Sequence, residues 1–168
     1  GIRIFDISNI KKPKQVGAVQ TCRGSHTHSV VAGPTADNKI IVYNSGTGRV
    51  REEDELDGCI GNIAGDTRTA YFSIDVIEIP INDPASSRIV SSPRVFADND
   101  KGIIAGLWRG GDHGDGTQDT RPTNQCHDIT VFPSAGIAAG ACSGNGILFD
   151  ISDPVSYTHL TLPTIGEV

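Results

Sequence analysis

The chain has 168 residues, a length that suits one ordinary domain, and its formal net charge is −6 with a pI near 5.2. Nucleic acids and anionic membranes select clustered Lys and Arg, so this acidic balance argues against both as partners. No apolar run approaches the roughly 18–20 residues of a membrane span, and we expect no transmembrane segment. The 20 glycines and the low aromatic content of 5% favour a turn-rich β-protein over a helical bundle.

A short apolar segment with an embedded aspartate occurs three times along the chain. It reads Ile-Arg-Ile-Phe-Asp-Ile at 2–7, Phe-Ser-Ile-Asp-Val-Ile at 72–77 and Gly-Ile-Leu-Phe-Asp-Ile-Ser at 146–152. We expect each segment to form a β-strand. Asp6, Asp75 and Asp150 should share one repeat position, where the carboxylate accepts backbone N–H bonds at a turn. Self-similarity of this kind indicates a repeat β-protein.

A second repeated pattern places a histidine just before an apolar strand, at His28 and at His127. Asp6 lies 22 residues before His28 and His127 lies 23 residues before Asp150, which gives an uninterrupted repeat of 45 residues. Four-stranded propeller blades run roughly 40–50 residues. The sequence therefore predicts an all-β fold, a partial β-propeller of about two four-stranded blades. Propellers typically close with 4–8 blades, so we expect the chain to be a fragment of a larger ring.

Two segments with loop composition interrupt the repeat, at about 44–69 and about 97–125. We expect them to be long insertions in a propeller-type domain at 1–154. They should lie on one face and give specificity for a protein or small-molecule ligand. Residues 155–168 depart from the repeat and resemble the translated sequencing-adapter tail of metagenome-derived reading frames. We therefore expect this tail to be non-native and exclude it from the fold.

Histidine placement gives the strongest candidate for a chemical site. In an extended segment His26 and His28 point to one face. Equivalent residues of successive blades share a radius, so His28 and His127 should converge on the central channel, where Asp128 or Cys126 could add a ligand. This pattern predicts a transition-metal site for copper or zinc. The alternative is that each histidine only hydrogen-bonds backbone at a blade end.

A second metal candidate is a loop that contains Asp112, Asp115 and Asp119 among glycines. Clustered carboxylates of this kind can bind calcium through oxygen ligands, although the EF-hand spacing is not met. The alternative is a solvated loop without an ion.

The four cysteines, Cys22, Cys59, Cys126 and Cys142, allow three pairings. A hairpin centred on residue 134 would place Cys126 and Cys142 opposite each other on antiparallel strands, near disulfide range. A bond between Cys22 and Cys59 would then tie the first insertion to its blade. Four reduced cysteines remain the alternative, and disulfides would indicate an oxidising compartment.

These motifs also carry a family resemblance. Residues 1–8, 73–76 and 146–154 resemble the LVIVD repeat of bacterial and archaeal propeller-like proteins, many of which are secreted or surface-attached. The resemblance implies a propeller-type fold in an extracellular, periplasmic or cell-surface location. Blades of this type are similar to those of selenium-binding proteins, which include methanethiol oxidases thought to use copper held by histidines. His26, His28 and His127 are the positions that could correspond to such ligands.

Two functions of different classes follow from these observations. The first is an extracytoplasmic binding or scaffold module of unassigned ligand. The second is a metal-dependent, copper-type oxidoreductase with a histidine-rich site at the propeller axis. Bound metal that depends on the histidines would separate the second from the first.

Overall fold

The computed structural model describes residues 1–61, 63, 66–107, 110–111, 114–116 and 121–160. Within these residues the protein is built from β-strands and two short 3-10 turns, Pro84–Ser86 and Pro133–Ala135, so the predicted all-β class is confirmed. The described residues contain no helix with the length and apolar character that crossing a membrane requires.

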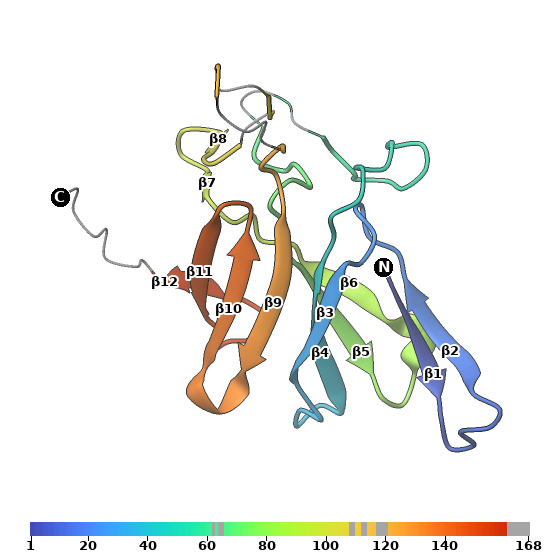
Figure 1. Cartoon of the computed structure of the whole chain (residues 1–168). Coiled ribbons are helices and arrows are strands. Elements are labelled where there is room, and N and C mark those ends of the chain that lie inside the picture. The colour runs from blue at the N-terminus through green and yellow to red at the C-terminus, as the bar shows by residue number, and fades with distance from the viewer. Residues whose placement is uncertain (62, 64–65, 108–109, 112–113, 117–120, 161–168) are drawn as a thin grey trace.

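The strands form antiparallel sheets whose members follow one another in the sequence (Figure 1). An N-terminal pair consists of β1 (Ile2–Asp6) and β2 (Lys14–Val19). A central sheet contains β3 (Thr27–Ala32), β4 (Lys39–Ser45), β5 (Asp75–Pro80) and β6 (Arg88–Ser91). A C-terminal sheet contains β9 (Cys126–Phe132), β10 (Ile137–Cys142), β11 (Asn145–Asp150) and β12 (Thr158–Leu160). The short strands β7 (Ala97–Asp98) and β8 (Ile103–Ile104) form a separate pair. Two four-stranded sheets are thus present, and no sheet of the described residues closes on itself.

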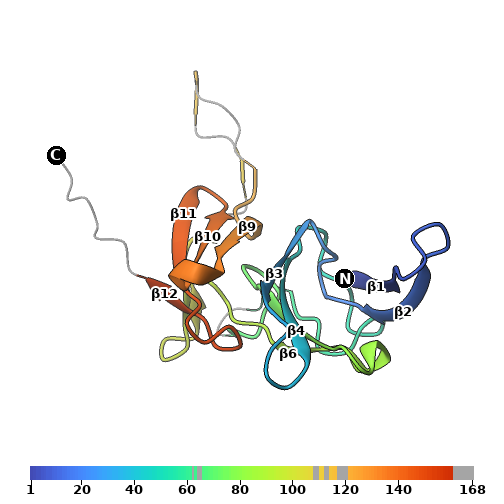
Figure 2. The same cartoon turned by 90° about the horizontal axis from the view of Figure 1, so that it is seen from below.

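The central sheet is buried on both of its faces. Ile41 and Tyr43 of β4 and Val76 of β5 belong to an apolar cluster with side chains of β9, β10 and β11. Val42 and Ile77, on the opposite face, pack instead with β1 and β2. Alternate residues of a strand point to opposite faces, so one strand serves two cores. Figure 2 shows the central sheet between the N-terminal pair and the C-terminal sheet. This two-sided burial explains why β4 and β5 read as nearly continuous apolar runs.

The two long connections leave the central and C-terminal sheets at the same end. The first insertion (residues 46–74) joins β4 to β5, and the second insertion (residues 92–125) joins β6 to β9. In an antiparallel sheet the end of β4, the start of β5 and the end of β6 lie at the same end of the sheet, and the start of β9 also lies there. Figure 1 shows the described parts of both insertions above this end. We expected them at about 44–69 and about 97–125, so both begin or end a few residues away from the prediction.

A buried phenylalanine, Phe72, and a partly buried one, Phe96, connect the bases of the insertions. Phe72 and Phe96 have positive φ angles of 52° and 67°, which bulky side chains rarely adopt. Their rings pack edge to face with centroids 5.0 Å apart, and Phe72 is completely buried. The Phe72 N–H also donates to the carbonyl of Asn124 at 2.9 Å. Tertiary packing therefore holds this backbone in a conformation that local preference disfavours.

The segment after Pro154 takes part in the fold. Tyr157 is buried, and its hydroxyl donates to the carbonyls of Ile74 and Pro93 at 3.4 and 3.3 Å. Residues 158–160 pair with β11, whose edge would otherwise expose backbone donors and acceptors. We predicted that residues 155–168 would lie outside the fold, whereas residues 155–160 belong to it in the structure. Residues 161–168 lie outside the described residues, and the non-native origin of the tail stays a prediction.

The repeated aspartates do not share one position. Asp6 and Asp150 end β1 and β11, and each Oδ1 accepts the backbone N–H of the serine two residues later, at 2.8 and 2.9 Å. The predicted turn role is confirmed for these two. Asp75 instead begins β5, is buried, and accepts hydrogen bonds from the side chains of Ser92 and Asn44. Burial raises the pKa of the Asp75 carboxyl.

Candidate metal centre

The starts of β3 and β9 are joined where the central and C-terminal sheets meet. The Thr27 hydroxyl donates to Oδ1 of Asp128, and the Ser29 hydroxyl donates to the carbonyl of Ile129 at 2.8 Å. These bonds cross from one sheet to the other and link residues about a hundred positions apart in the sequence. They fix the relative position of the polar residues that precede and begin the two strands.

Three potential metal ligands converge at this junction. Among the described residues, His26, His127 and Asp128 each offer one ligand atom, and these atoms lie within 4.8 Å of one another. Nδ1 of His127 lies 2.6 Å from Oδ2 of Asp128, and Nδ1 of His26 lies 3.7 Å from Oδ1 of the same carboxylate. The two imidazole rings have centroids 3.9 Å apart. The side chains remain between 40% and 51% exposed, so the group is open to solvent.

The carboxylate of Asp128 organises this group. Hydrogen bonds from Thr27 and His127 lower the pKa of Asp128, so it stays ionised at neutral pH. A carboxylate only accepts hydrogen bonds, so Nδ1 of His127 is the donor in this pair. An ion bound by both side chains would replace the shared proton, because metal ligands bind in their deprotonated form.

Three of the four residues predicted as ligands therefore come together, and His28 does not. The prediction paired His28 with His127 because they begin equivalent strands. His28 lies opposite the buried Asn44 in the β3–β4 ladder, and its Nδ1 is 3.3 Å from the Ser25 hydroxyl. Thr27, next to it in β3, is the residue that faces Asp128. His26 precedes the strand in a bend, so the alternation that should have aligned it with His28 does not extend to it.

The geometry suits a divalent ion after a small adjustment of exposed side chains. Zinc binds imidazole nitrogen and carboxylate oxygen at about 2.0–2.2 Å, which places tetrahedral ligand atoms about 3.3 Å apart. The three atoms would need to approach one another by at most about 1.5 Å from their present spacing. Three protein ligands leave at least one coordination position for water or a bound molecule.

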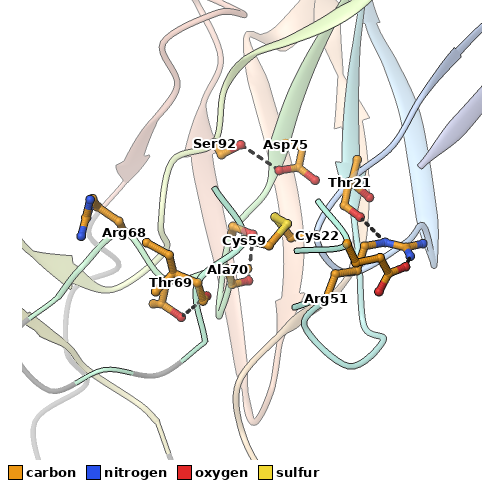
Figure 3. Close-up of a disulfide and its surroundings, with 12 residues drawn as sticks. Thr21, Cys22, Arg51, Cys59, Arg68, Thr69, Ala70, Asp75 and Ser92 are labelled. Atoms are coloured by element: carbon orange, nitrogen blue, oxygen red, sulfur yellow. Dashed lines mark hydrogen bonds and ion pairs between the residues drawn. A yellow bond between two sulfur atoms is a disulfide. The ribbon is translucent and has the colours of Figure 1, made fainter. Parts of the chain in front are cut away.

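The four cysteines form two disulfides, Cys22–Cys59 and Cys126–Cys142. Cys126 lies opposite Cys142 in the β9–β10 ladder, as the hairpin centre indicated, and the bond fixes the strand start that carries His127. Cys126 is therefore not available as a thiolate ligand. Cys59 brings the middle of the first insertion to Cys22, beside Thr21 and Arg51 (Figure 3).

The calcium candidate is described only in part. Asp115 is exposed, whereas Asp112 and Asp119 lie outside the described residues. The predicted calcium site therefore stays a prediction.

Sequence reasoning did not find Thr27 as a partner of the site. Its hydroxyl bonds to a carboxylate 101 residues away, and nothing local in the sequence distinguishes it from any other strand threonine. No family model, curated protein or solved structure matches the chain significantly. The LVIVD resemblance accordingly stays a prediction.

Proposed function

We propose that the chain is part of an extracytoplasmic, propeller-type binding module that holds a zinc ion through His26, His127 and Asp128. The convergence of these three side chains at the junction of β3 and β9 carries the proposal. A coordination position left open to solvent would let the ion take a carboxylate, imidazole or water from a ligand.

Sheet architecture and disulfides support the setting of this proposal. Two four-stranded antiparallel meanders stack face to face, as successive blades of a propeller would, and the sequence repeat has the length of a blade. Two disulfides are typical of proteins that fold in an oxidising compartment. The blade assignment and the secreted location rest on these features together with the resemblance to LVIVD repeats.

Zinc fits the available ligands better than a copper centre that cycles between oxidation states. Cu(I) prefers soft thiolate and thioether ligands. The chain contains no methionine, and all four cysteines are in disulfides. Imidazole and carboxylate remain, which suit Zn²⁺ and Cu²⁺. We therefore favour a binding module over the copper-type oxidoreductase, which would require copper to bind in both states.

Removal of a ligand should abolish tight zinc binding. We expect His127→Ala to weaken Zn²⁺ binding by at least about 100-fold, because it deletes one of three ligands and frees the Asp128 carboxylate that it orients. Isothermal titration of metal-free protein with ZnCl₂ measures the effect. His28→Ala is the matched control, since it removes a neighbouring exposed histidine that lies outside the group.

A parallel titration with Asp128→Asn should also show weaker binding, because the neutral amide is a poorer ligand and no longer fixes His127. Zinc binding that is unchanged in His127→Ala, or that is lost equally in His28→Ala, would contradict the assigned ligand set. Copper bound in both oxidation states with turnover of a thiol substrate would instead favour the oxidoreductase.

A further inference from the structure

A second candidate site, which shares no residue with the histidine group, lies between the two insertions. A pocket of about 290 Å³ is lined by Thr47–Val50 of the first insertion and by Arg121, Pro122, Asn124 and Gln125 of the second, with Arg23 and Tyr71 between them. This volume is at the lower end of pockets that hold small organic ligands. The lining is formed jointly by segments that the sequence separates by about 70 residues.

The charge of the pocket is opposite to that of the protein. Three arginines, Arg23, Arg49 and Arg121, line it, and its lining contains no aspartate or glutamate of the residues that the structure describes. The chain as a whole carries a formal net charge of −6. A concave site with several cations and no acid concentrates positive potential locally and attracts anions.

Arg23 is a buried cation with neutral partners. It is only 7% exposed, and its Nε donates to the carbonyl of Gly48 at 2.8 Å. Its other guanidinium nitrogens donate to the Asn124 carbonyl, the Asn124 side chain, Gln125 Oε1 and the Thr47 carbonyl. The guanidinium carbon lies 5.2 Å from the centre of the Tyr71 ring. No carboxylate of the described residues forms an ion pair with it.

A buried charge without a counter-charge is unusual. Buried ions in proteins are normally paired, because neutral hydrogen bonds replace only part of the solvation that is lost. Burial accordingly lowers the pKa of Arg23. An anion in the adjoining pocket would supply the negative charge that no carboxylate of the described residues provides to Arg23.

The other two arginines can bind the same anion. The Arg49 side chain is 86% exposed and pairs with the exposed Glu52, a surface ion pair of small energetic value. It can exchange this partner for a ligand at little cost. Arg121 is exposed at the end of the second insertion. Guanidinium groups bind carboxylate and phosphate oxygens in a bidentate manner, which favours these ligands over halides.

We propose that the pocket between the insertions binds a small oxyanion, a carboxylate or a phosphate, through Arg49 and Arg121 above the buried Arg23. This site is separate from the zinc site and does not depend on it. Tyr71 adds an aromatic wall, so a ligand that joins a carboxylate or phosphate to an organic body would fill more of the space than an inorganic ion.

The test is a calorimetric titration of the full chain, stripped of metal, with succinate and with inorganic phosphate at constant ionic strength in NaCl. We expect millimolar or tighter binding of at least one probe, and the tighter of the two distinguishes carboxylate from phosphate as the preferred group. Arg121→Gln and Arg49→Gln should each weaken binding by about tenfold or more, because each removes charge-assisted hydrogen bonds. Both residues are exposed, so neither change should affect folding.

Arg88→Gln is the matched control. Arg88 of β6 is also exposed and forms an ion pair, in its case with Glu78 of β5, and it does not line the pocket. Arg88→Gln changes the net charge by the same amount as Arg49→Gln or Arg121→Gln. Equal weakening by Arg88→Gln would show a general charge effect and overturn the proposal, as would the absence of binding beyond that of chloride. Binding that persists in His127→Ala would show that the anion site is independent of the zinc site, whereas its loss there would overturn the separation of the two.

Discussion

Replacing Arg23 with alanine should lower the free energy of unfolding by about 4 kcal/mol, one of the two largest effects that we expect in this protein. The guanidinium donates to oxygens of both insertions, from Thr47 and Gly48 on one side and from Asn124 and Gln125 on the other. Its removal leaves several part-buried acceptors without a donor, each at a cost of about 1–3 kcal/mol before water enters the space. Packing against Tyr71 is lost as well.

Urea denaturation of the oxidised protein measures this change. Arg23→Lys should be intermediate, because an ammonium keeps the charge but cannot reach acceptors placed for a planar fork. Arg49→Ala, which removes an exposed arginine paired with the exposed Glu52, should cost less than about 1 kcal/mol. A cost for Arg23→Ala as small as that of Arg49→Ala would show that the insertions are held together by other contacts.

The Cys22→Ser/Cys59→Ser double variant should lose about 4 kcal/mol of stability by the loop-closure estimate. The bond joins residues 37 positions apart and anchors a segment whose described residues form no regular strand. Hydrogen bonds also join the insertion to the segment that contains Cys22. The Arg51 N–H donates to the Cys22 carbonyl at 3.0 Å, and the Arg23 side chain donates to the Gly48 carbonyl at 2.8 Å. Figure 3 shows the disulfide between Cys22 and Cys59 beside Arg51.

The same double variant should separate the two proposed sites. The first insertion lines the oxyanion pocket, whereas the zinc ligands stand at the starts of β3 and β9 and are held by Thr27 and the Cys126–Cys142 bond. We therefore expect anion affinity to fall much more than zinc affinity. Urea denaturation and the two titrations check this on one preparation. A stability loss below about 1 kcal/mol would show that hydrogen bonds alone hold the first insertion.

Local sequence patterns were sufficient to predict the features that depend only on the order of neighbouring residues. Alternating and continuous apolar runs predicted most of the strands, because a strand buried on one face has alternating apolar residues and a strand buried on both faces has a continuous apolar run. The centre of a short hairpin indicated that Cys126 faces Cys142, as the structure has it, although the sequence left open whether the two form a disulfide. Loop composition likewise located both insertions to within several residues.

Tertiary structure decided which side chains meet across sheets. The sequence proposed both His26 and His28 beside His127, but the packing of β3 on β9 brings only His26 there, because a bend before β3 breaks the two-residue alternation. Asp75 and Arg23 carry no local signal of their burial, and their partners lie on other strands or insertions. Contacts between distant segments depend on how the sheets stack on one another. The sequence pattern predicts on which face of a strand a side chain lies, but it does not predict which other element packs against that face.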